Sequence, residues 1–520
     1  MPDNMPEKKQ YRLFLINPVQ KHKHFATQIE MGRMLGKKNV MTPLSLALIA
    51  ALTPENYSIR IIDEEIEAIP TNQLPDIVGI TTLSITINRA YEIADFYRKQ
   101  GIPVVMGGPY ATYMREEILE HADSVVIGEA EELWGKCLAD FESNTLQAVY
   151  ESEVKPAYKK SVIPRWDLVN TKDVLTLGVQ VSRGCPYHCE FCLVTQMFGN
   201  KMRYREIENV IEEIRSLPLK KILFVDDNLT FNKKYALELT KQLKPLRITW
   251  TCQSSIEIGF EEELLREMEA SGCQNIIIGL ESLNESSINE VSKFHNRIGE
   301  YRQAIANILN AGIQVYPSFV VGFDHDTPED FDKIIRFAEE CNLPYVMISL
   351  LGASPGSELY ARANKDGRWY GSPTELRGGI FPVMYYKNFS QVEIYRKYIA
   401  SLQQLYSFKN IAKRAIALYD KGTFSRQNAT DDIGFFFKVN VSAQLLKCYL
   451  FSADKDKRAL FLHLFRLFRK KKLAIDKMII FLLSMEGITL HIRKLADGSE
   501  EFVKIFEKFD LMRQTPKNNS

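Results

Sequence analysis

Short apolar runs separated by amphipathic segments mark the first part of the chain. They occupy residues 13–17, 58–62, 76–81, 104–107 and 124–128. Apolar runs of this length at helix-sized intervals are typical of buried parallel strands joined by crossover helices. The pattern predicts an α/β fold whose first domain, residues 1–150, is a doubly wound, Rossmann-like sheet.

The same alternation continues further along the chain with longer intervals. Six apolar runs, each followed by helix-like sequence, lie at residues 179–182, 222–226, 249–253, 276–281, 315–321 and 346–351. Regular repetition of strand and helix favours a barrel-like sheet with helices outside. We therefore expect a second domain of barrel type over residues 151–374.

From about residue 375 the strand signal fades and apolar residues recur at helical spacing, which predicts a mostly helical domain over residues 375–520. Within it a basic stripe over residues 457–472 interleaves with leucine and phenylalanine. The favoured interpretation is a core-facing helix with a solvated basic edge. The alternative is an amphipathic helix that makes peripheral contact with an anionic membrane.

Composition narrows the class of protein. The 520 residues carry a formal charge of +1, so nothing draws the chain to nucleic acid. The polar first residues lack the apolar core of a signal peptide, and no run is long enough for a membrane span, so a cytoplasmic location is expected. Eight cysteines, three of them in one motif, do not form a disulfide framework.

Small and polar residues follow the predicted strands of the first domain. Open parallel sheets bind ligands outside the carboxyl ends of their strands. Ordinary turn residues would explain any one of these positions, but together they indicate a ligand site. The candidates are Thr82, Ser84, Gly107, Gly108, Ala111, Thr112, Gly128 and Glu129.

Polar residues also follow the predicted strands of the second domain. Two carboxylates and an amide directly after an apolar strand cost stability unless they are solvated or bind something. For the glutamate at 281 a charge at a helix N-terminus is the alternative. The candidates are Asp226, Asp227, Asn228, Gln253, Ser255, Glu281 and Ser282.

The strongest chemical signal is a triad of cysteines, Cys185, Cys189 and Cys192, on a tight turn opened by Gly184. Three thiolates suit an iron-sulfur cluster that keeps one iron open. A closed zinc site would need a fourth ligand. His188 is a poor choice because it is adjacent to Cys189 and would have to bend back onto the same ion.

The C-x3-C-x2-C spacing, with Phe191 before the last cysteine, resembles the signature of radical S-adenosylmethionine (SAM) enzymes. The resemblance implies that the cysteines hold a 4Fe-4S cluster whose open iron chelates SAM, inside a partial (β/α)6 barrel. It places Phe191 near the adenine, and the turns at 322–323 and 355–356 beside adenine and substrate. One residue of 226–228 would lie near the SAM amino group, and Gln253 and Ser255 would reach its carboxylate or ribose.

The first domain, directly upstream of the cysteines, resembles the cobalamin-binding domain of one large branch of these enzymes, closest at residues 105–108 and 126–129. The order of domains is similar to that of hopanoid and bacteriochlorophyll methylases. The motif Asp-x-His-x-x-Gly, which places a histidine on cobalt in many cobalamin proteins, is absent; His22, His24 and His121 have other contexts. The resemblance therefore implies cobalamin without a protein histidine on cobalt.

The function implied is a cobalamin-dependent radical SAM C-methyltransferase. Its substrate would be an unactivated carbon of a lipid-like, tetrapyrrole or other natural product, and its electron donor a flavodoxin or ferredoxin. A cyclase or ring-rearranging enzyme with the same cofactors is the first alternative, and a cobalamin or iron-sulfur sensor the second. A methylthiotransferase is disfavoured because the other cysteines are scattered. The helical tail, including residues 435–437, is expected to cover the open end of the barrel.

Overall fold

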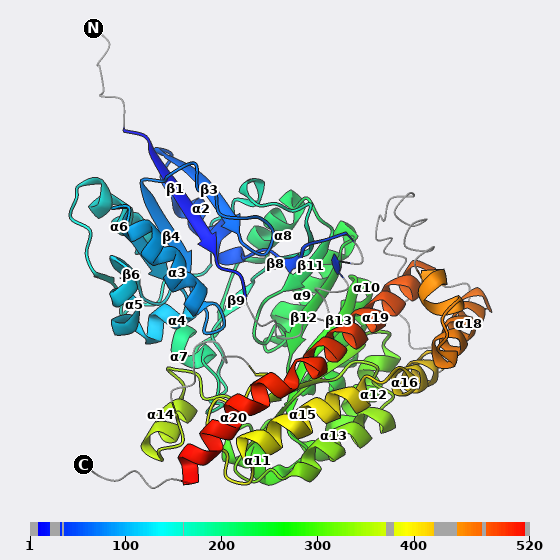
Figure 1. The fold of residues 1–520 in the computed structure, drawn as a ribbon. Coiled ribbons are helices and arrows are strands. Elements are labelled where there is room, and N and C mark those ends of the chain that lie inside the picture. Colours follow the sequence, from blue (N-terminus) through cyan, green and yellow to red (C-terminus); the bar gives the residue numbers. More distant parts are fainter. Residues whose placement is uncertain are drawn as a thin grey trace.

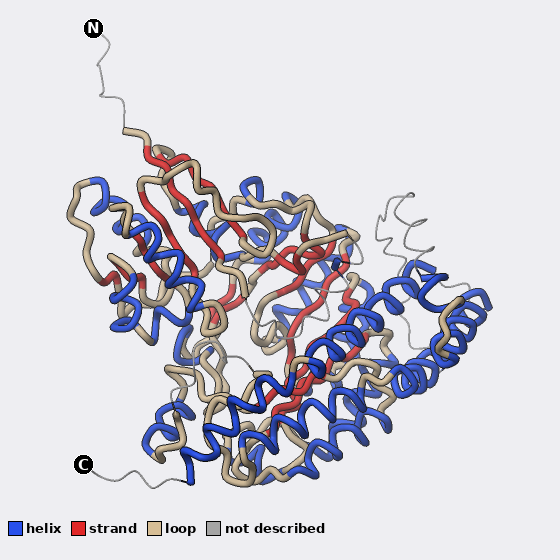
Figure 2. Tube along the Cα trace, in the orientation of Figure 1, coloured by secondary structure: helices blue, strands red, loops and turns tan. Residues whose placement is uncertain are grey.

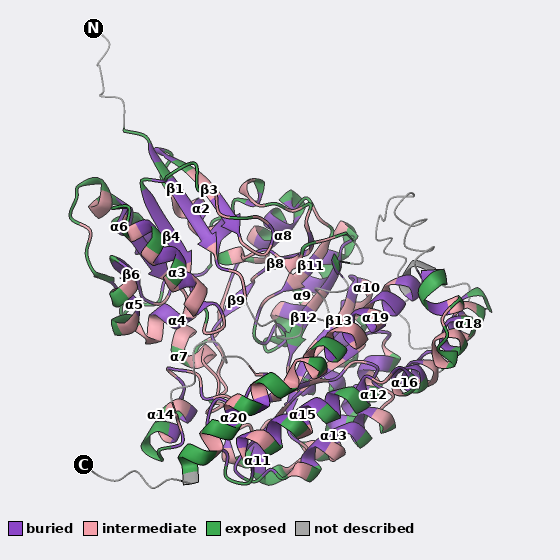
Figure 3. Cartoon of the chain, in the orientation of Figure 1, coloured by how far each residue is buried: buried purple, intermediate pink, exposed green. Residues whose placement is uncertain are grey.

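Two parallel sheets and a helical tail make up the protein (Figures 1 and 2). The computed structural model describes residues 9–20, 32–33, 36–159, 161–370, 379–420, 445–470 and 475–514. The strands are mostly buried, while the outer faces of the helices are exposed (Figure 3). The predicted α/β architecture is confirmed.

The first sheet has six parallel strands in the order β3-β1-β4-β5-β6-β7. Strand order reverses direction between β1 and β4, which defines a doubly wound sheet, as predicted. The sequence pattern did not predict the last strand, β7, because it is only two residues long. The strands are β1 (Tyr11–Asn17), β3 (Tyr57–Asp63), β4 (Ile77–Thr81), β5 (Val104–Gly107), β6 (Ser124–Val126) and β7 (Val149–Tyr150), and the helices that follow them are α3 (Ile87–Arg98), α4 (Pro109–Tyr113), α5 (Arg115–His121) and α6 (Trp134–Glu142).

The second sheet has seven parallel strands in the order β15-β14-β13-β12-β11-β8-β2. Its end strands do not pair with each other, so the barrel is incomplete, as the resemblance implied. The first predicted strand was placed too late: the strand ends at residue 179 instead of starting there. The elements are β8 (Val174–Val179), α8 (Ile207–Ser216), β11 (Lys221–Phe224), α9 (Lys233–Leu243), β12 (Thr249–Ser254), α10 (Glu262–Ala270), β13 (Cys273–Glu281), α11 (Glu285–Glu290), α12 (Tyr301–Asn310), β14 (Gln314–Val321), α13 (Pro328–Glu340) and β15 (Met347–Leu350).

A short stretch of the first domain belongs to the second sheet. Strand β2 (Asn39–Met41) pairs in parallel with β8, with Met41 opposite Thr176. The next helix, α2 (Leu44–Leu52), packs against β1 and β3 of one sheet and β8 of the other. Apart from the exposed Ser45 its residues are apolar, as expected for a helix that packs between two sheets. The two domains therefore share one hydrophobic core.

The tail is helical, as predicted. Helix α15 packs on α13 and β15, and α20 packs on α15, so the tail covers the edge strand β15 (Figure 1, yellow to red). Within the described part of the tail, the segment 379–390 reaches the carboxyl ends of the strands, where the Tyr386 hydroxyl donates to the Leu351 carbonyl at 2.8 Å. The helices are α14 (Glu358–Lys365), α15 (Gln391–Leu405), α16 (Phe408–Asp420), η6 (Leu446–Leu450), α18 (Lys455–Lys470), α19 (Ile475–Asp497) and α20 (Ser499–Gln514).

The basic stripe begins in α18, which buries Leu460, Leu464 and Phe468 in the core. Lys457 forms an ion pair with Glu486 at 2.6 Å. These contacts fit a core-facing helix with a basic edge. Residues 435–437 and 471–472 lie outside the described part of the chain. Within the described residues, no helix is both long and apolar enough to span a membrane.

Candidate active site

The three cysteines lie on a loop carried by a very short hairpin. Strand β9 (Ser182–Arg183) pairs antiparallel with β10 (Arg203–Tyr204), and the loop between them includes helix α7 (Val194–Phe198). We call this pair of strands the stem of the cysteine loop. Gly184 follows the stem with φ of +91°, and a Cβ there would overlap the Lys201 carbonyl oxygen. Only glycine fits this position.

All three cysteines are free and partly buried. The Cys192 amide donates to the Cys189 carbonyl at 2.9 Å, and the Val194 amide donates to the Cys192 Sγ at 3.5 Å. Burial raises the pKa of Cys189 to about 12 and that of Cys192 to about 11. The thiols therefore stay protonated until a metal displaces their protons.

The described residues include no group of three His, Cys, Asp or Glu side chains gathered as for one metal ion. Zinc in a structural site draws all its ligands onto a single centre. The triad offers three thiols, which suits an iron-sulfur cluster with one open iron better than the four-coordinate, closed site of structural zinc.

The adjacent carboxylates at the end of β11 have opposite environments. Asp226 is fully buried and accepts from the Val181 amide at 3.1 Å, and from the amide and hydroxyl of Ser182. Burial raises the pKa of Asp226 to about 7, although these donors oppose the shift. Asp226 thus anchors the stem to the barrel.

Asp227, by contrast, is exposed and makes no ion pair among the described residues. Desolvation of its carboxylate by the surrounding protein still raises the pKa of Asp227 to about 6. Its charge acts on Cys185 and Cys192. Asp227 is therefore the carboxylate of the two that faces the cysteine loop and stays available to a ligand.

The other candidates on β11 and β12 come together because these strands are neighbours. Asn228 is buried, and its Oδ1 accepts from the Ser255 amide at 3.4 Å. The Ser255 hydroxyl donates to Glu257 at 3.3 Å. Gln253 is exposed near the end of β12. Gln253 and Asp227 are thus the two exposed polar groups of this cluster.

Glu281 has an unusual backbone and a partner that the sequence did not reveal. Its φ is +62°, at an irregularity in the pairing of β13 with β14, and its carboxylate forms a buried ion pair with Lys293. Burial lowers the pKa of Lys293, but Glu281 and Cys189 outweigh it and raise the pKa. Asn284, not Glu281, caps α11. The ion pair therefore brings a cation next to the cysteines.

Two further contacts hold the loop from the far side of the barrel. The Phe191 ring lies 6.2 Å from that of Phe323, between centroids, so it packs beside the turn at 322–323. Arg362 on α14 binds both carboxylate oxygens of Glu190, at 2.6 and 2.8 Å.

Ser282, the last candidate of the second domain, is buried, and its hydroxyl accepts from the Asn284 amide at 3.0 Å.

Hydrogen bonds tie the strand ends of the first sheet together. The Thr82 hydroxyl donates to the Gly107 carbonyl at 2.9 Å and accepts from the Ala111 amide at 3.0 Å. The Thr112 hydroxyl donates to the Gly108 carbonyl and accepts from the Gly128 amide, each at 3.0 Å. The loops after β4, β5 and β6 therefore form one connected edge, beside which Ser84 is half-buried.

The glycines at this edge have different roles. Gly108 has φ of +104°, and a Cβ there would lie 2.9 Å from the Thr82 carbonyl oxygen, so close backbone packing requires glycine. Gly128 has φ of +77°, and its Cβ position is open except for the Lys155 ammonium at 4.0 Å. Gly128 is thus the glycine that leaves space for a ligand.

The carboxyl edges of the two sheets adjoin. Tyr113, at the end of α4, packs its ring on Gly356, where φ of +92° and the ring leave no room for a side chain. Burial raises the pKa of Tyr113 to about 12, with a smaller contribution from Cys192. Glu129, after β6, pairs with Arg183 and Arg203 of the stem. The cysteine loop therefore lies next to the strand ends of the first sheet.

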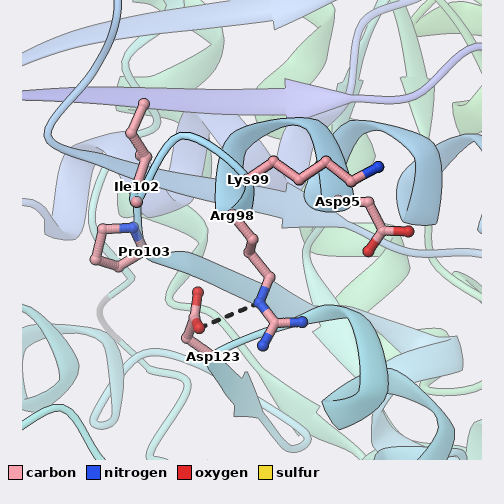
Figure 4. Close-up of a pocket in the computed structure, with 7 residues that line it drawn as sticks. Asp95, Arg98, Lys99, Ile102, Pro103 and Asp123 are labelled. Carbon is pink, nitrogen blue, oxygen red and sulfur yellow. Dashed lines mark hydrogen bonds and ion pairs between the residues drawn. The ribbon is translucent and has the colours of Figure 1, made fainter.

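A separate surface hollow lies at the opposite end of the first sheet, on the side of the amino ends of its strands. It has a volume of about 470 Å³, and the Arg98 Nε bonds Asp123 at 3.2 Å within it (Figure 4). It adjoins the amino end of β5, away from the strand ends described above. It is lined by Asp95, Arg98, Lys99, Gly101, Ile102, Pro103 and Asp123.

Comparisons with known proteins agree with both halves of the site. The profile of the radical SAM superfamily matches residues 179–338, and that of the B12 binding domain matches residues 37–136. The chain belongs to the cobalamin-dependent radical SAM family. The family predicted from the cysteine motif is confirmed, and so are the three cofactors it implies: a 4Fe-4S cluster, SAM and cobalamin.

Similar members of the cobalamin-dependent radical SAM family include two methylases. Bacteriochlorophyllide d C-8(2)-methyltransferase of Chlorobaculum tepidum is 28% identical over 72% of this chain and 87% of its own length. The hopanoid C-2 methylase of Rhodopseudomonas palustris is 27% identical over 63% and 65%. The solved structure of TsrM from Kitasatospora setae shares the fold, with a TM-score of 0.57 at 14% identity over 76% of this chain and 91% of TsrM.

We predict that replacing Cys185, Cys189 and Cys192 together with alanine abolishes cluster binding without unfolding the protein. Anaerobically reconstituted wild type should hold about four irons and four sulfides per chain. Cys448→Ala is the matched control, because this exposed cysteine lies on η6. Iron and acid-labile sulfide analyses measure the outcome; stoichiometric zinc without sulfide in the wild type would contradict it.

We also predict opposite effects for the two adjacent carboxylates. Asp226→Asn should destabilise the protein by about 1.5–3 kcal/mol and weaken cluster retention, because one amide donor of the stem would face an amide nitrogen. Asp227→Asn should leave the stability of the protein and its cluster retention unchanged and weaken SAM binding instead. Thermal unfolding, iron content and equilibrium dialysis with SAM separate the two. Equal loss of stability in both variants would disprove the assignment.

Proposed function

We propose that this protein is a methyltransferase that transfers a methyl group to an unactivated carbon. The observation that supports this most directly is that the strand ends of the B12-binding sheet adjoin the cysteine loop. A methyl carrier and a radical source are thereby placed at one site. Two relatives whose names state that they methylate a bacteriochlorophyllide and a hopanoid are similar to this chain over 72% and 63% of its length.

In this proposal Cys185, Cys189 and Cys192 hold the cluster, and the residues around them bind SAM. Asp227 is available to the SAM amino group, and Gln253 to its carboxylate or ribose. When bound, cluster and SAM supply a 5′-deoxyadenosyl radical and cobalamin supplies the methyl group. The chain's own contribution is to hold these groups in order and to exclude water.

The strand ends of the first sheet would bind cobalamin, with the open position at Gly128 facing it. His121, the described histidine of the first domain, bonds Asp95 at 2.9 Å and stacks on Tyr91, at the amino side of β6 and away from this edge. His22 and His24 lie outside the described residues. We propose that cobalt carries no protein histidine.

The substrate would be lipid-like, a tetrapyrrole or another natural product, and the electron donor a flavodoxin or ferredoxin. Free, partly buried thiols favour a reducing compartment, and with it a cytoplasmic location. The exposed cations Arg466, Arg469 and Lys470 on α18 are the described residues that would support peripheral contact with an anionic membrane.

The methyltransferase proposal predicts a specific product balance. Anaerobic reactions with SAM labelled in its methyl group, and either a bacteriochlorophyllide or a hopanoid offered, should yield a methylated product. S-adenosylhomocysteine and 5′-deoxyadenosine should then form in about equal amounts, since one SAM supplies the radical and another the methyl group. A cyclase would form 5′-deoxyadenosine and an unlabelled product, and a sensor neither; either result refutes the proposal.

The axial ligand of cobalt gives a second prediction. The electron paramagnetic resonance spectrum of the cob(II)alamin form should lack hyperfine splitting from a histidine nitrogen. The double variant His22→Ala/His24→Ala and the variant His121→Ala should both leave the spectrum unchanged. Nitrogen splitting that disappears in either variant would show that a protein histidine binds cobalt.

A further inference from the structure

The stem of the cysteine loop places two like charges directly opposite each other. Arg183 of β9 is paired with Arg203 of β10 in the antiparallel register. Side chains of directly opposite residues share one face of the pair, and like charges there are destabilising. The stem is therefore stable only if an anion lies against this face.

The anion comes from the other domain. Glu129, in the loop after β6, binds the Arg183 Nη1 through Oε2 at 2.5 Å and the Arg203 Nη2 through Oε1 at 2.5 Å. Its side chain is only 2% exposed, and that of Arg183 is 7% exposed. Both carboxylate oxygens are thus engaged by guanidinium groups, and the carboxylate itself is closed to water, while Arg203 is 20% exposed.

Other contacts hold the two guanidinium groups in place. Arg183 also pairs with Glu131 at 2.6 Å, and its guanidinium lies 4.3 Å from the centre of the Tyr158 ring. Arg203 donates to the Pro156 carbonyl at 2.7 Å. Each arginine is fixed by groups beyond Glu129, so the position of the carboxylate fixes the position of the stem.

Glu129 is equally well fixed on its own side. Its neighbour Gly128 donates to the Thr112 hydroxyl, which belongs to the hydrogen-bonded edge of the first sheet. On the opposite side of the stem, Asp226 of the barrel accepts from Ser182. The cysteine loop therefore has one carboxylate anchor in each domain, with Arg183 two residues before Cys185.

We infer that Glu129 is a positioning residue that sets the spacing between the cluster and cobalamin. It joins the edge proposed to bind cobalamin to the stem that carries the cluster ligands. This inference rests on the proposed function only for the place of cobalamin. It differs from the sequence-based interpretation of Glu129 as a cofactor contact, because the side chain is 2% exposed and both of its oxygens accept from guanidinium groups.

The test is the magnetic coupling between cob(II)alamin and the reduced cluster, both of which carry an unpaired spin. Glu129→Gln removes the charge that both arginines need while keeping the shape of the side chain. We expect full iron and cobalamin content, with a coupling that is weaker or more widely distributed than in the wild type. Glu340→Gln is the matched control: its pair with Arg302 has the same length, 2.5 Å, but is exposed.

Hydrogen exchange of the protein without cofactors provides a second measurement. Amide exchange in the stem should accelerate by at least about tenfold in Glu129→Gln and not in Glu340→Gln, because the stem loses its anchor in the first domain. If Glu129→Gln does not fold, Arg203→Gln takes its place. Arg203→Gln leaves the Glu129–Arg183 pair intact, so the expected acceleration is smaller but still confined to the stem.

The outcomes are decisive in both directions. Unchanged exchange and unchanged coupling in Glu129→Gln and Arg203→Gln would overturn the inference. Loss of cobalamin from Glu129→Gln with unchanged exchange would also overturn it, because Glu129 would then act on the cofactor directly. Failure of the wild type to bind cobalamin would count against the proposed function alone, since exchange reports the anchor without any cofactor.

Discussion

The position of the cysteine loop depends on buried carboxylates, because its own secondary structure is too short to hold it. Strands β9 and β10 have two residues each, far below the length that makes a hairpin stable alone. Asp226 binds the stem from the barrel, and Glu129 binds it from the first domain. A buried charge is tolerated only with partners in good geometry, so each carboxylate permits a single arrangement of the stem. The three cysteines take their positions from that arrangement.

The positions of most strands along the chain could be predicted because they follow from local apolar runs, but the joint between the domains could not. Strand β2 has three residues, and its pairing with β8 joins segments more than a hundred positions apart in sequence. Helix α2 carries no amphipathic stripe, because it has a sheet on either side. A pattern that lacks periodicity indicates burial without saying against what. The place of this segment is decided by the fold as a whole.

The sequence predicted those parts of the site that depend on the spacing of residues along the chain. It did not predict those that depend on the direction in which a side chain points. The cysteine triad could be recognised because three thiols within eight residues indicate that they bind one common group. Asp226 and Asp227 are neighbours, yet successive side chains of an extended chain point to opposite sides, so one is in the core and the other faces the site. Arg183, Arg203 and Lys293 were missed because a lone charged residue is usually on the surface. Their partners become neighbours only in the folded chain.

An incomplete barrel has two edges, and this chain covers both with its flanking domains. On one side β2 pairs with β8, and on the other the Leu350 amide of β15 donates to the Gly379 carbonyl at 2.7 Å. Directly before β15, the Tyr406 hydroxyl accepts from the Val346 amide at 3.0 Å and also donates to its carbonyl. Uncovered edge strands invite pairing with other chains. The tail thus has a structural role that the sequence pattern did not reveal, because it covers the edge strand β15.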